Sequence, residues 1–268
     1  MIHFVVALPA EAKPLIDYYG LNAVRSEHFK IYEGDGYRLI VSGVGKIKAA
    51  EAVSFLQTFS DAHRNQIWMN VGVGGHPKRD LGEGILAHKI VDQASGETWY
   101  PPLAIEAPCV TDSILTVNRP ETEYQESVVY DMEASGFYPA ATQFSTAELV
   151  QCFKVISDNR TSSPKNISAR SVERWIEENV KTIDRIAKQL TKLAEKLPSV
   201  DVPSGEFQKF MEHWHFTVSE QHRLRRLLMR LKTLEPKVEF WPELETLKKS
   251  KDVFNCLEDR IRSLPVRL

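Results

Sequence analysis

Apolar runs of strand length alternate with stretches of helical periodicity along residues 1–158. The runs are nearly continuous in aliphatic and aromatic residues, which is typical of strands covered on both faces. Between them, residues 49–59 and 133–144 carry apolar side chains at helical spacing. This alternation predicts an α/β domain. The predicted strands are residues 2–8, 37–42, 67–73, 84–91, 107–111, 128–130 and 152–156.

The remainder of the chain has a purely helical pattern. Ser168 is a suitable N-cap for one long helix over residues 168–197, whose apolar positions recur at helical spacing. Two prolines between 198 and 203 then mark a boundary. Leucines share one helical face between 224 and 234, and residues 242–264 predict another helix. The expected organisation is a domain over residues 1–198 and a helical C-terminal extension over residues 203–268.

The composition places the chain among globular proteins. Of 268 residues, 43% are hydrophobic and 26% are charged, which excludes a mostly disordered chain. No apolar run approaches the roughly 20 residues of a membrane-spanning helix. The net charge of -2 argues against a surface that binds nucleic acid throughout. Cys109, Cys152 and Cys256 are widely separated, so we expect no disulfide framework and no zinc ribbon, and a reducing cytoplasm fits best.

Glycine-bearing turns follow three predicted strands, at residues 43–45, 72–75 and, less strictly, 34–36. In open α/β sheets, ligands bind beyond the carboxyl ends of the strands, and glycine lets the backbone approach them closely. None of these turns has the spacing of a dinucleotide-binding motif or a P-loop. A small anionic or sugar-bearing ligand is therefore the generic expectation. The alternative is that each turn is only a tight connection.

Three acidic residues occupy comparable places, because each follows a predicted strand: Glu11, Glu133 and Asp158. If they converge at one edge of the sheet, they can supply a general acid, a carboxylate that orients water and an acceptor for sugar hydroxyls. The alternative is that Glu133 only favours a helix N-terminus and that the other two are solvated loop residues.

Five segments, taken in order, resemble the purine nucleoside phosphorylase/uridine phosphorylase superfamily, and most closely its methylthioadenosine/S-adenosylhomocysteine nucleosidase branch. The resemblance covers roughly residues 1–197. It implies a three-layer α/β fold with a central mixed sheet that is partly closed into a barrel and flanked by helices. The segments are Val5–Glu11, Ser42–Ala50, Asn70–Gly75, Tyr130–Ala134 and Val155–Asp158.

The resemblance also implies roles for residues of this chain. Glu11 would orient the attacking water, and Asp158 would protonate the purine at N7 so that the base leaves neutral. Glu133 would accept hydrogen bonds from the ribose hydroxyls. Further substrate-binding positions are Met132 packing on the sugar, Ser157 serving the base, Ile114 standing where the family has an aromatic residue, Val73 standing where nucleosidases often have serine, and the neighbouring Gly74 and Gly75. No metal and no cofactor are expected.

Three functions remain open at this point. Purine nucleoside hydrolysis is favoured over phosphorolysis, because an acid at Glu11 would repel bound phosphate. Phosphorolysis would need cations, for which Lys46, Arg79 and Arg119 are the candidates. The third possibility is a catalytically quiet nucleoside-binding module. Family members complete their site with residues of a neighbouring subunit, so the resemblance implies a homodimer.

The C-terminal extension lies beyond the resemblance. Its segment 222–232 is rich in arginine and lacks acids, which can indicate binding to nucleic acid or to an anionic surface. A solvated helical face is the preferred interpretation, because charges over residues 201–268 are nearly balanced. His213 and His215 are two residues apart and point to different helix faces, so they do not predict a metal site. The five leucines more plausibly dock the helices on the main domain or on a partner subunit.

Overall fold

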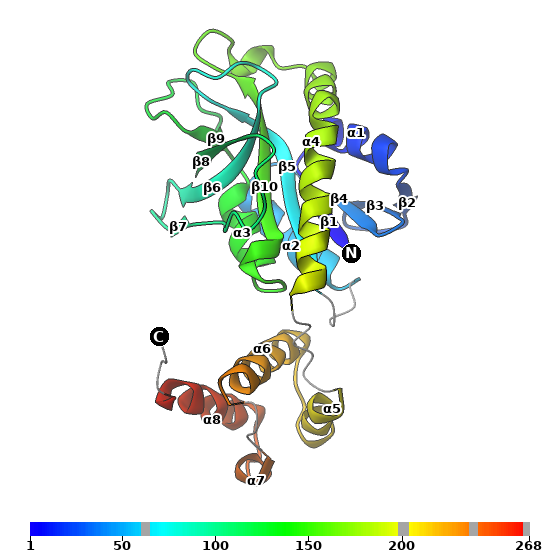
Figure 1. The fold of residues 1–268 in the computed structure, drawn as a ribbon, viewed down its shortest axis with the longest axis vertical. Helices are drawn as coiled ribbons and strands as arrows, with labels where there is room; N and C mark the ends of the chain where they lie inside the picture. Colours follow the sequence, from blue (N-terminus) through cyan, green and yellow to red (C-terminus); the bar gives the residue numbers. More distant parts are fainter. Residues whose placement is uncertain (60–64, 198–203, 236–240, 265–268) are drawn as a thin grey trace. The chain divides into compact units, whose positions relative to one another are not determined.

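A mixed ten-stranded sheet is the central feature of residues 1–197 (Figure 1). The computed structural model describes residues 1–59, 65–197, 204–235 and 241–264. The chain divides into two compact units, residues 1–197 and residues 198–268. The strands are β1 (Ile2–Val6), β2 (Asn22–Val24), β3 (Lys30–Gly34), β4 (Tyr37–Val41), β5 (Ile67–Gly75), β6 (Gly84–Asp92), β7 (Thr98–Trp99), β8 (Val110–Thr116), β9 (Val129–Asp131) and β10 (Val150–Asp158).

Part of this sheet closes on itself. The strands pair in the order β10-β6-β8-β9-β5-β1-β4-β3-β2, with β7 added to β6. Because β10 also pairs with β5, the strands β5, β9, β8, β6 and β10 form a ring. The pairing is parallel between β10 and β5 and antiparallel between β10 and β6. The mixed, partly barrel-closed α/β fold implied by the resemblance is therefore confirmed.

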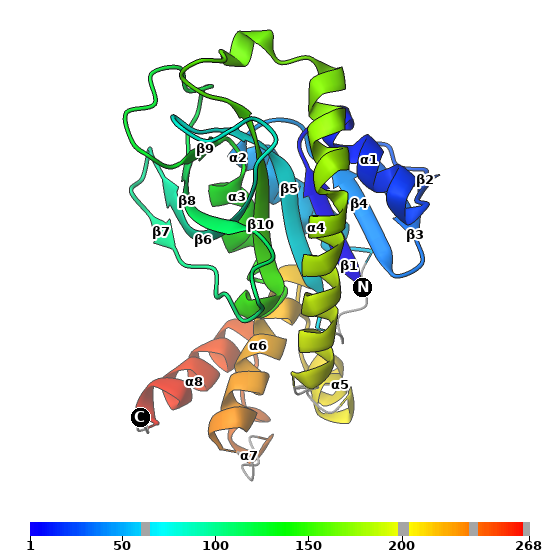
Figure 2. The ribbon, with the colours of Figure 1, turned by 45° about the horizontal axis from the view of Figure 1, so that its top comes forward.

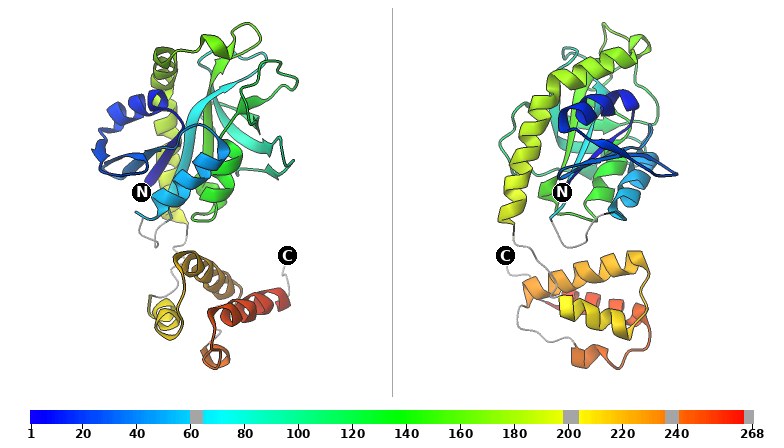
Figure 3. Two further views of the ribbon diagram at one scale, coloured as in Figure 1. Left: turned by 180° about the vertical axis from the view of Figure 1, so that it is seen from behind. Right: turned by 90° about the vertical axis from the view of Figure 1, so that its right-hand side faces the viewer.

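Helices cover both faces of the sheet, because alternate side chains of the inner strands point to opposite sides. Phe4 and Val6 pack in one core cluster with α1 (Pro9–Tyr19) and α4 (Ala169–Lys196), whereas Val5 packs in another with α2 (Lys46–Gln57) and α3 (Ala134–Ala141). Figures 2 and 3 show α4 running along the sheet beside α1. Two short 3-10 helices complete this unit, η1 (Ala147–Leu149) and η2 (Pro164–Asn166).

Most expected elements are present, with differences at their ends. The long helix begins as predicted, since the Ser168 hydroxyl accepts a hydrogen bond from the N–H of Ser171. The strand expected at 107–111 instead spans Val110–Thr116. Pro108 has no N–H for a strand ladder, so pairing begins only after it. Helix α1 and the hairpin of β2 and β3 were not predicted, because their short segments carry neither a clear helical periodicity nor a clear alternation of apolar residues.

The helical unit has a core of its own. It contains α5 (Ser204–His213), α6 (Val218–Leu234), α7 (Trp241–Leu244) and α8 (Ser250–Ser263), so the single helix predicted over 242–264 is two helices. Two cations of the basic segment pair with acids of the same unit, Arg223 with Glu258 and Lys232 with Glu206, both at 2.6 Å. Within the described parts of the chain, no helix is long and apolar enough to cross a membrane. The core side chains are Phe210, Trp214, Phe216, Leu224, Leu228, Leu231, Leu244, Val253, Phe254, Leu257 and Ile261.

Candidate active site

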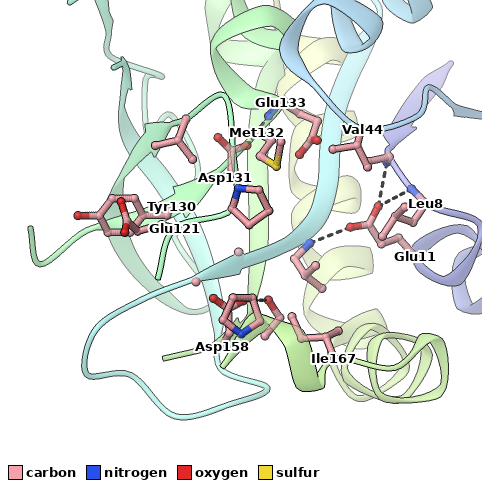
Figure 4. Close-up of a pocket in the computed structure, with 18 residues that line it drawn as sticks. Leu8, Glu11, Val44, Glu121, Tyr130, Asp131, Met132, Glu133, Asp158 and Ile167 are labelled. Carbon is pink, nitrogen blue, oxygen red and sulfur yellow. Dashed lines mark hydrogen bonds between the residues drawn. The ribbon is translucent and has the colours of Figure 1, made fainter. Parts of the chain in front are cut away.

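A cavity of about 210 Å³ lies among residues that end or directly follow β1, β4, β5, β8, β9 and β10. Figure 4 shows its walls, with Glu11, Glu133 and Asp158 on different sides of the opening. These acids are far apart in the sequence, and the sheet brings them to one place. Of the nine site residues expected from the sequence, the cavity is lined by Glu11, Val73, Gly74, Gly75, Met132, Glu133, Ser157 and Asp158.

Glu11 lies in the first turn of α1, and backbone N–H groups surround its carboxyl group. Oε2 accepts hydrogen bonds from Ala7 and Leu8, both at 2.8 Å, and Oε1 accepts one from Val73 at 3.0 Å (Figure 4). The side chain is only 2% exposed. Burial, followed by repulsion from Glu133, raises the pKa of Glu11 to about 7. Near neutral pH this carboxyl group therefore exchanges a proton readily, as a general base must.

Glu133 stands at the N-cap position of α3 and faces the same cavity. Its Oε1 accepts a hydrogen bond from the N–H of Gly45 at 3.0 Å, which joins the start of α3 to the start of α2. The neighbouring Asp131 shapes this turn, because its Oδ2 accepts the N–H groups of Glu133 and Ala134. Burial raises the pKa of Glu133, while the nearby Lys154 opposes that shift.

Lys154 is a functional candidate that the sequence reasoning missed. It lies on β10 with its side chain 1% exposed, and its Nζ is 2.9 Å from Asp131 Oδ2 and 3.6 Å from Glu133 Oε2. Burial alone would lower the pKa of Lys154, but attraction to the two carboxylates holds it above its ordinary value. The ammonium group of Lys154 is thus held by the carboxylates of Asp131 and Glu133. A single lysine inside the apolar run 152–156 was the available signal.

Asp158 ends β10, and two hydroxyl groups approach its carboxyl group. The Ser157 hydroxyl donates to Oδ1, and the phenol of Tyr124 donates to Oδ2. Tyr124 is the second residue that the sequence reasoning missed. It comes from the polar segment 117–128 between β8 and β9, which has no periodic pattern that could have marked it.

Ile114 is the predicted site residue that the structure does not bring to the cavity. It lies in the middle of β8, is fully buried at 0% exposure, and packs in the core cluster that includes α2 and α3. The expectation followed from placing the end of this strand five residues too early. The residues just beyond the true end of β8, Val117, Pro120 and Glu121, line the cavity instead.

The three candidate phosphate ligands are engaged or exposed. Lys46 Nζ lies 2.7 Å from Asp92 Oδ2, and Arg79 pairs with both Asp112 and Glu83 at 2.7 Å. Arg119 lies on the surface, and none of the three lines the cavity. Among the described residues, no group of three or more His, Cys, Asp or Glu side chains is arranged to hold a metal ion.

Solved structures with this architecture include 5′-methylthioadenosine/S-adenosylhomocysteine nucleosidases. The Helicobacter pylori enzyme with butyl-thio-DADMe-Immucillin-A has a TM-score of 0.57 and 11% identity, over 70% of this chain and 97% of its own. The S. pneumoniae enzyme with a transition-state inhibitor has a TM-score of 0.57 and 16% identity, over 70% and 99%. This chain has the nucleosidase fold.

The nucleosidase fold does not by itself define a substrate. A futalosine hydrolase mutant of Helicobacter pylori also matches, with a TM-score of 0.55 and 12% identity over 70% of this chain and 98% of its own. The sequence matches no model of a known protein family, and a search of curated proteins finds no match either. Substrate and reaction must therefore be argued from the residues of the cavity.

Proposed function

We propose that this chain is a hydrolase that cleaves the N-glycosidic bond of a purine nucleoside with an oriented water molecule. The observation that carries the proposal is the convergence of Glu11, Glu133 and Asp158 on one cavity from three strand ends. Breaking this bond builds positive charge on the ribose and negative charge on the departing base. Carboxylates beside the sugar and a proton donor beside the base stabilise both ends of such a transition state.

Each acid has a distinct part in the proposed reaction. Ionised Glu11 accepts a hydrogen bond from the attacking water and directs its oxygen to the anomeric carbon. Glu133 accepts hydrogen bonds from the ribose 2′- and 3′-hydroxyls, with Met132 against the sugar. Asp158 delivers a proton to purine N7, so the base leaves neutral, and Ser157 orients that carboxyl group. The proton released by water can remain on Glu11, whose pKa of about 7 suits this step.

Hydrolysis is favoured over phosphorolysis by the charges around the cavity. Lys46 and Arg79 already pair with carboxylates, and the buried Lys154 pairs with Asp131. Phosphate would therefore meet Glu11 and Glu133 with no arginine among the described residues that line the cavity. A neutral water molecule has no such repulsion to overcome.

The proposal is tested by product analysis with and without phosphate. Adenosine, inosine, 5′-methylthioadenosine and S-adenosylhomocysteine form the substrate panel. The expected products are free base and free sugar in equal amounts, at a rate that does not depend on phosphate. Asp158→Asn should lower turnover by about 10²-fold, whereas Asp35→Asn at an exposed hairpin turn should not change it. Turnover only with phosphate, giving a sugar 1-phosphate, would identify a phosphorylase instead.

We also propose that the protein acts as a homodimer. Aliphatic side chains are exposed beside the cavity, with Val44 at its rim and Ile47 at 71% exposure on the next turn. A second copy that covers this patch would remove it from water and could help to close the site. Sedimentation of the full chain tests this, with a dimer expected and a monomer at micromolar concentration contradicting it.

A further inference from the structure

The phenol of Tyr124 occupies the space next to Asp158. Its hydroxyl donates to Oδ2 of that carboxyl group, and its ring packs edge-to-face on Tyr130, with the ring centroids 5.8 Å apart. Tyr124 is 1% exposed and belongs to a small apolar cluster with Leu115, Val117 and Tyr130. Burial and the bond to Asp158 both raise the pKa of this phenol, so it stays neutral and remains a donor.

The chain around Tyr124 holds it in a strained conformation. Its φ of 49° lies in the left-handed region, where a residue with a side chain is uncommon. Glu121 Oε1 accepts the N–H groups of residues 122, 123 and 124, and the guanidinium of Arg160 donates to the Tyr124 carbonyl at 2.8 Å. The segment 117–128 thus brings the side chain of Tyr124 to Asp158, which lines the cavity. Backbone strain of this kind clusters at active sites and at segments that clamp ligands.

Gly75 is what makes room for this arrangement. A Cβ atom there would lie 2.3 Å from Asp158 Oδ2 and 2.9 Å from a ring carbon of Tyr124, so all three groups meet at one point. The remaining cavity of about 210 Å³ is smaller than the roughly 300–1,000 Å³ of typical small-molecule sites. Tyr124 does not itself line this cavity, but its side chain contacts Asp158 and Tyr130, which do, so displacement of the tyrosine would enlarge the cavity at that end.

We propose that Tyr124 determines specificity at the base end of the site: its phenol occupies the base position beside Asp158, and a nucleoside binds only when its base displaces that phenol. This inference rests on the proposed function, in which Asp158 serves the base. A base succeeds only if it can replace the hydrogen bond that Tyr124 makes to Asp158. A nucleoside whose base cannot hydrogen bond to a carboxyl group at that point is therefore excluded, even if its ribose fits.

The decisive variant is Tyr124→Phe, which keeps the ring and removes only the hydroxyl bond to Asp158. Calorimetry with the full chain measures the Kd of adenosine and of 5′-methylthioadenosine. Binding should tighten about two- to tenfold, because Asp158 carries its proton in the proposed reaction and a hydrogen bond between neutral groups contributes a factor of about two to ten. Tyr18→Phe is the matched control, since Tyr18 lies on α1, is 47% exposed and does not line the cavity.

A second variant tests the position of the ring without a nucleoside. Tyr124→Ala should leave a space that binds 4-methylphenol, since an engineered cavity can bind a small aromatic molecule that fits it, whereas the wild type should not bind it. Circular dichroism checks that each variant is folded. If the wild type hydrolyses both nucleosides but Tyr124→Phe binds them no more tightly than the wild type does, the inference is wrong and the proposed function stands. If no form binds a nucleoside although Tyr124→Ala binds 4-methylphenol, the proposed function is wrong, and the inference falls with it.

Discussion

At the residue scale, the site is governed by a cluster of buried charged groups, in which several acids lie near the one cation of Lys154. Glu133 and Asp131 contact Lys154 directly, and Glu11 lies close enough to be affected by both Glu133 and Lys154. With more acids than bases out of water, the cluster retains a proton more readily than exposed carboxylates do. This explains how a carboxyl group held by three N–H donors can still have a pKa near neutrality. If water surrounded Glu11, the pKa of its carboxyl group would return toward the ordinary value.

The activity and stability of the wild type should therefore depend on pH through Glu11. If ionised Glu11 orients water, the acid side of the pH profile should rise as pH increases through about 7. Glu11→Gln should nearly abolish hydrolysis while nucleoside binding persists, because only the positioning of the nucleophile is lost. Rates and Kd measured from pH 5 to 9 check both statements. Undiminished hydrolysis by Glu11→Gln would remove this residue from the mechanism.

Stability follows from the same shift, with a definite sign. The folded pKa of Glu11 lies above its ordinary value of 4.5, so its stabilising contribution is complete below about pH 4.5 and disappears as pH rises through about 7. The wild type should lose about 3 kcal/mol more than Glu11→Gln across that interval. Urea unfolding at pH 4.5, 6 and 7.5 measures the difference. The exposed Glu195→Gln should follow the wild type.

Lys154 gives a second prediction at this scale. Lys154→Met leaves Asp131 and Glu133 buried without their cation, which should reduce the free energy of unfolding by about 3–5 kcal/mol. It should also move the rise of activity with pH upward, because Lys154 lowers the pKa of Glu11. Lys13→Met is the control, since Lys13 pairs with Glu173 where both side chains reach water, at 61% and 32% exposure, and such a pair contributes little to stability. Equal effects of the two variants would contradict the buried-cluster interpretation.

At the scale of elements, the first turns of helices build the site. Glu11 belongs to the start of α1, Gly45 precedes α2, and Glu133 precedes α3. The hydrogen bond from Gly45 to Glu133 holds only if α2 and α3 pack very closely. Gly136 allows this contact, because a Cβ atom there would lie 1.9 Å from the Lys46 carbonyl oxygen.

Gly136→Ala should therefore separate the two helices and disturb the site together with the core. The obstructing atoms are backbone, so they cannot turn aside, and overpacking of this kind costs about 1–3 kcal/mol or more. Gly20→Ala is the comparison, because nothing lies within 4 Å and only its φ of +63° opposes a side chain. For Gly136→Ala, the temperature of thermal unfolding and the affinity for nucleoside should both decrease. For Gly20→Ala, binding should persist despite a loss of about 1–2 kcal/mol.

At the scale of the whole molecule, the chain joins two units whose cores are separate. Among the described residues, the core clusters of residues 1–197 contain no member of the helical unit, and the cluster of the helical unit contains no residue of 1–197. Inside the first unit, the side chain of Asn65 donates to the carbonyls of Ala194 and Leu197, which anchors the end of α4. The proposed division near residue 198 therefore predicts that each part can fold alone.

A chain that ends at Leu197 should consequently fold and retain the nucleoside activity of the full protein. Circular dichroism, thermal unfolding and turnover of residues 1–197 are the measurements, together with unfolding of residues 198–268 expressed separately. Cooperative unfolding is expected for both. A folded 1–197 fragment without activity would mean that the C-terminal helices complete the site, and an unfolded fragment would contradict the proposed division.

The local pattern of the chain was enough to predict much of the fold. Continuous apolar runs identify β1, β5 and β10, because strands covered on both faces need apolar residues at every position. An acid that directly follows a buried strand can also be recognised without tertiary information. Because β1, β5 and β10 are parallel, their carboxyl ends lie at the same edge of the sheet. This is why Glu11 and Asp158 could be proposed together from the sequence.

Only the tertiary structure decided the rest of the site. Tyr124 reaches Asp158 through a segment without periodicity, whose path depends on the contacts of Glu121 and Arg160. Lys154 is tolerated in a core strand because Asp131 arrives from another strand to pair with it. Ile114 was misplaced because the end of β8 is set by pairing with β6 and β9 and not by its own residues. Loop paths, strand ends and buried charge pairs depend on contacts between distant residues, so local pattern alone does not determine them.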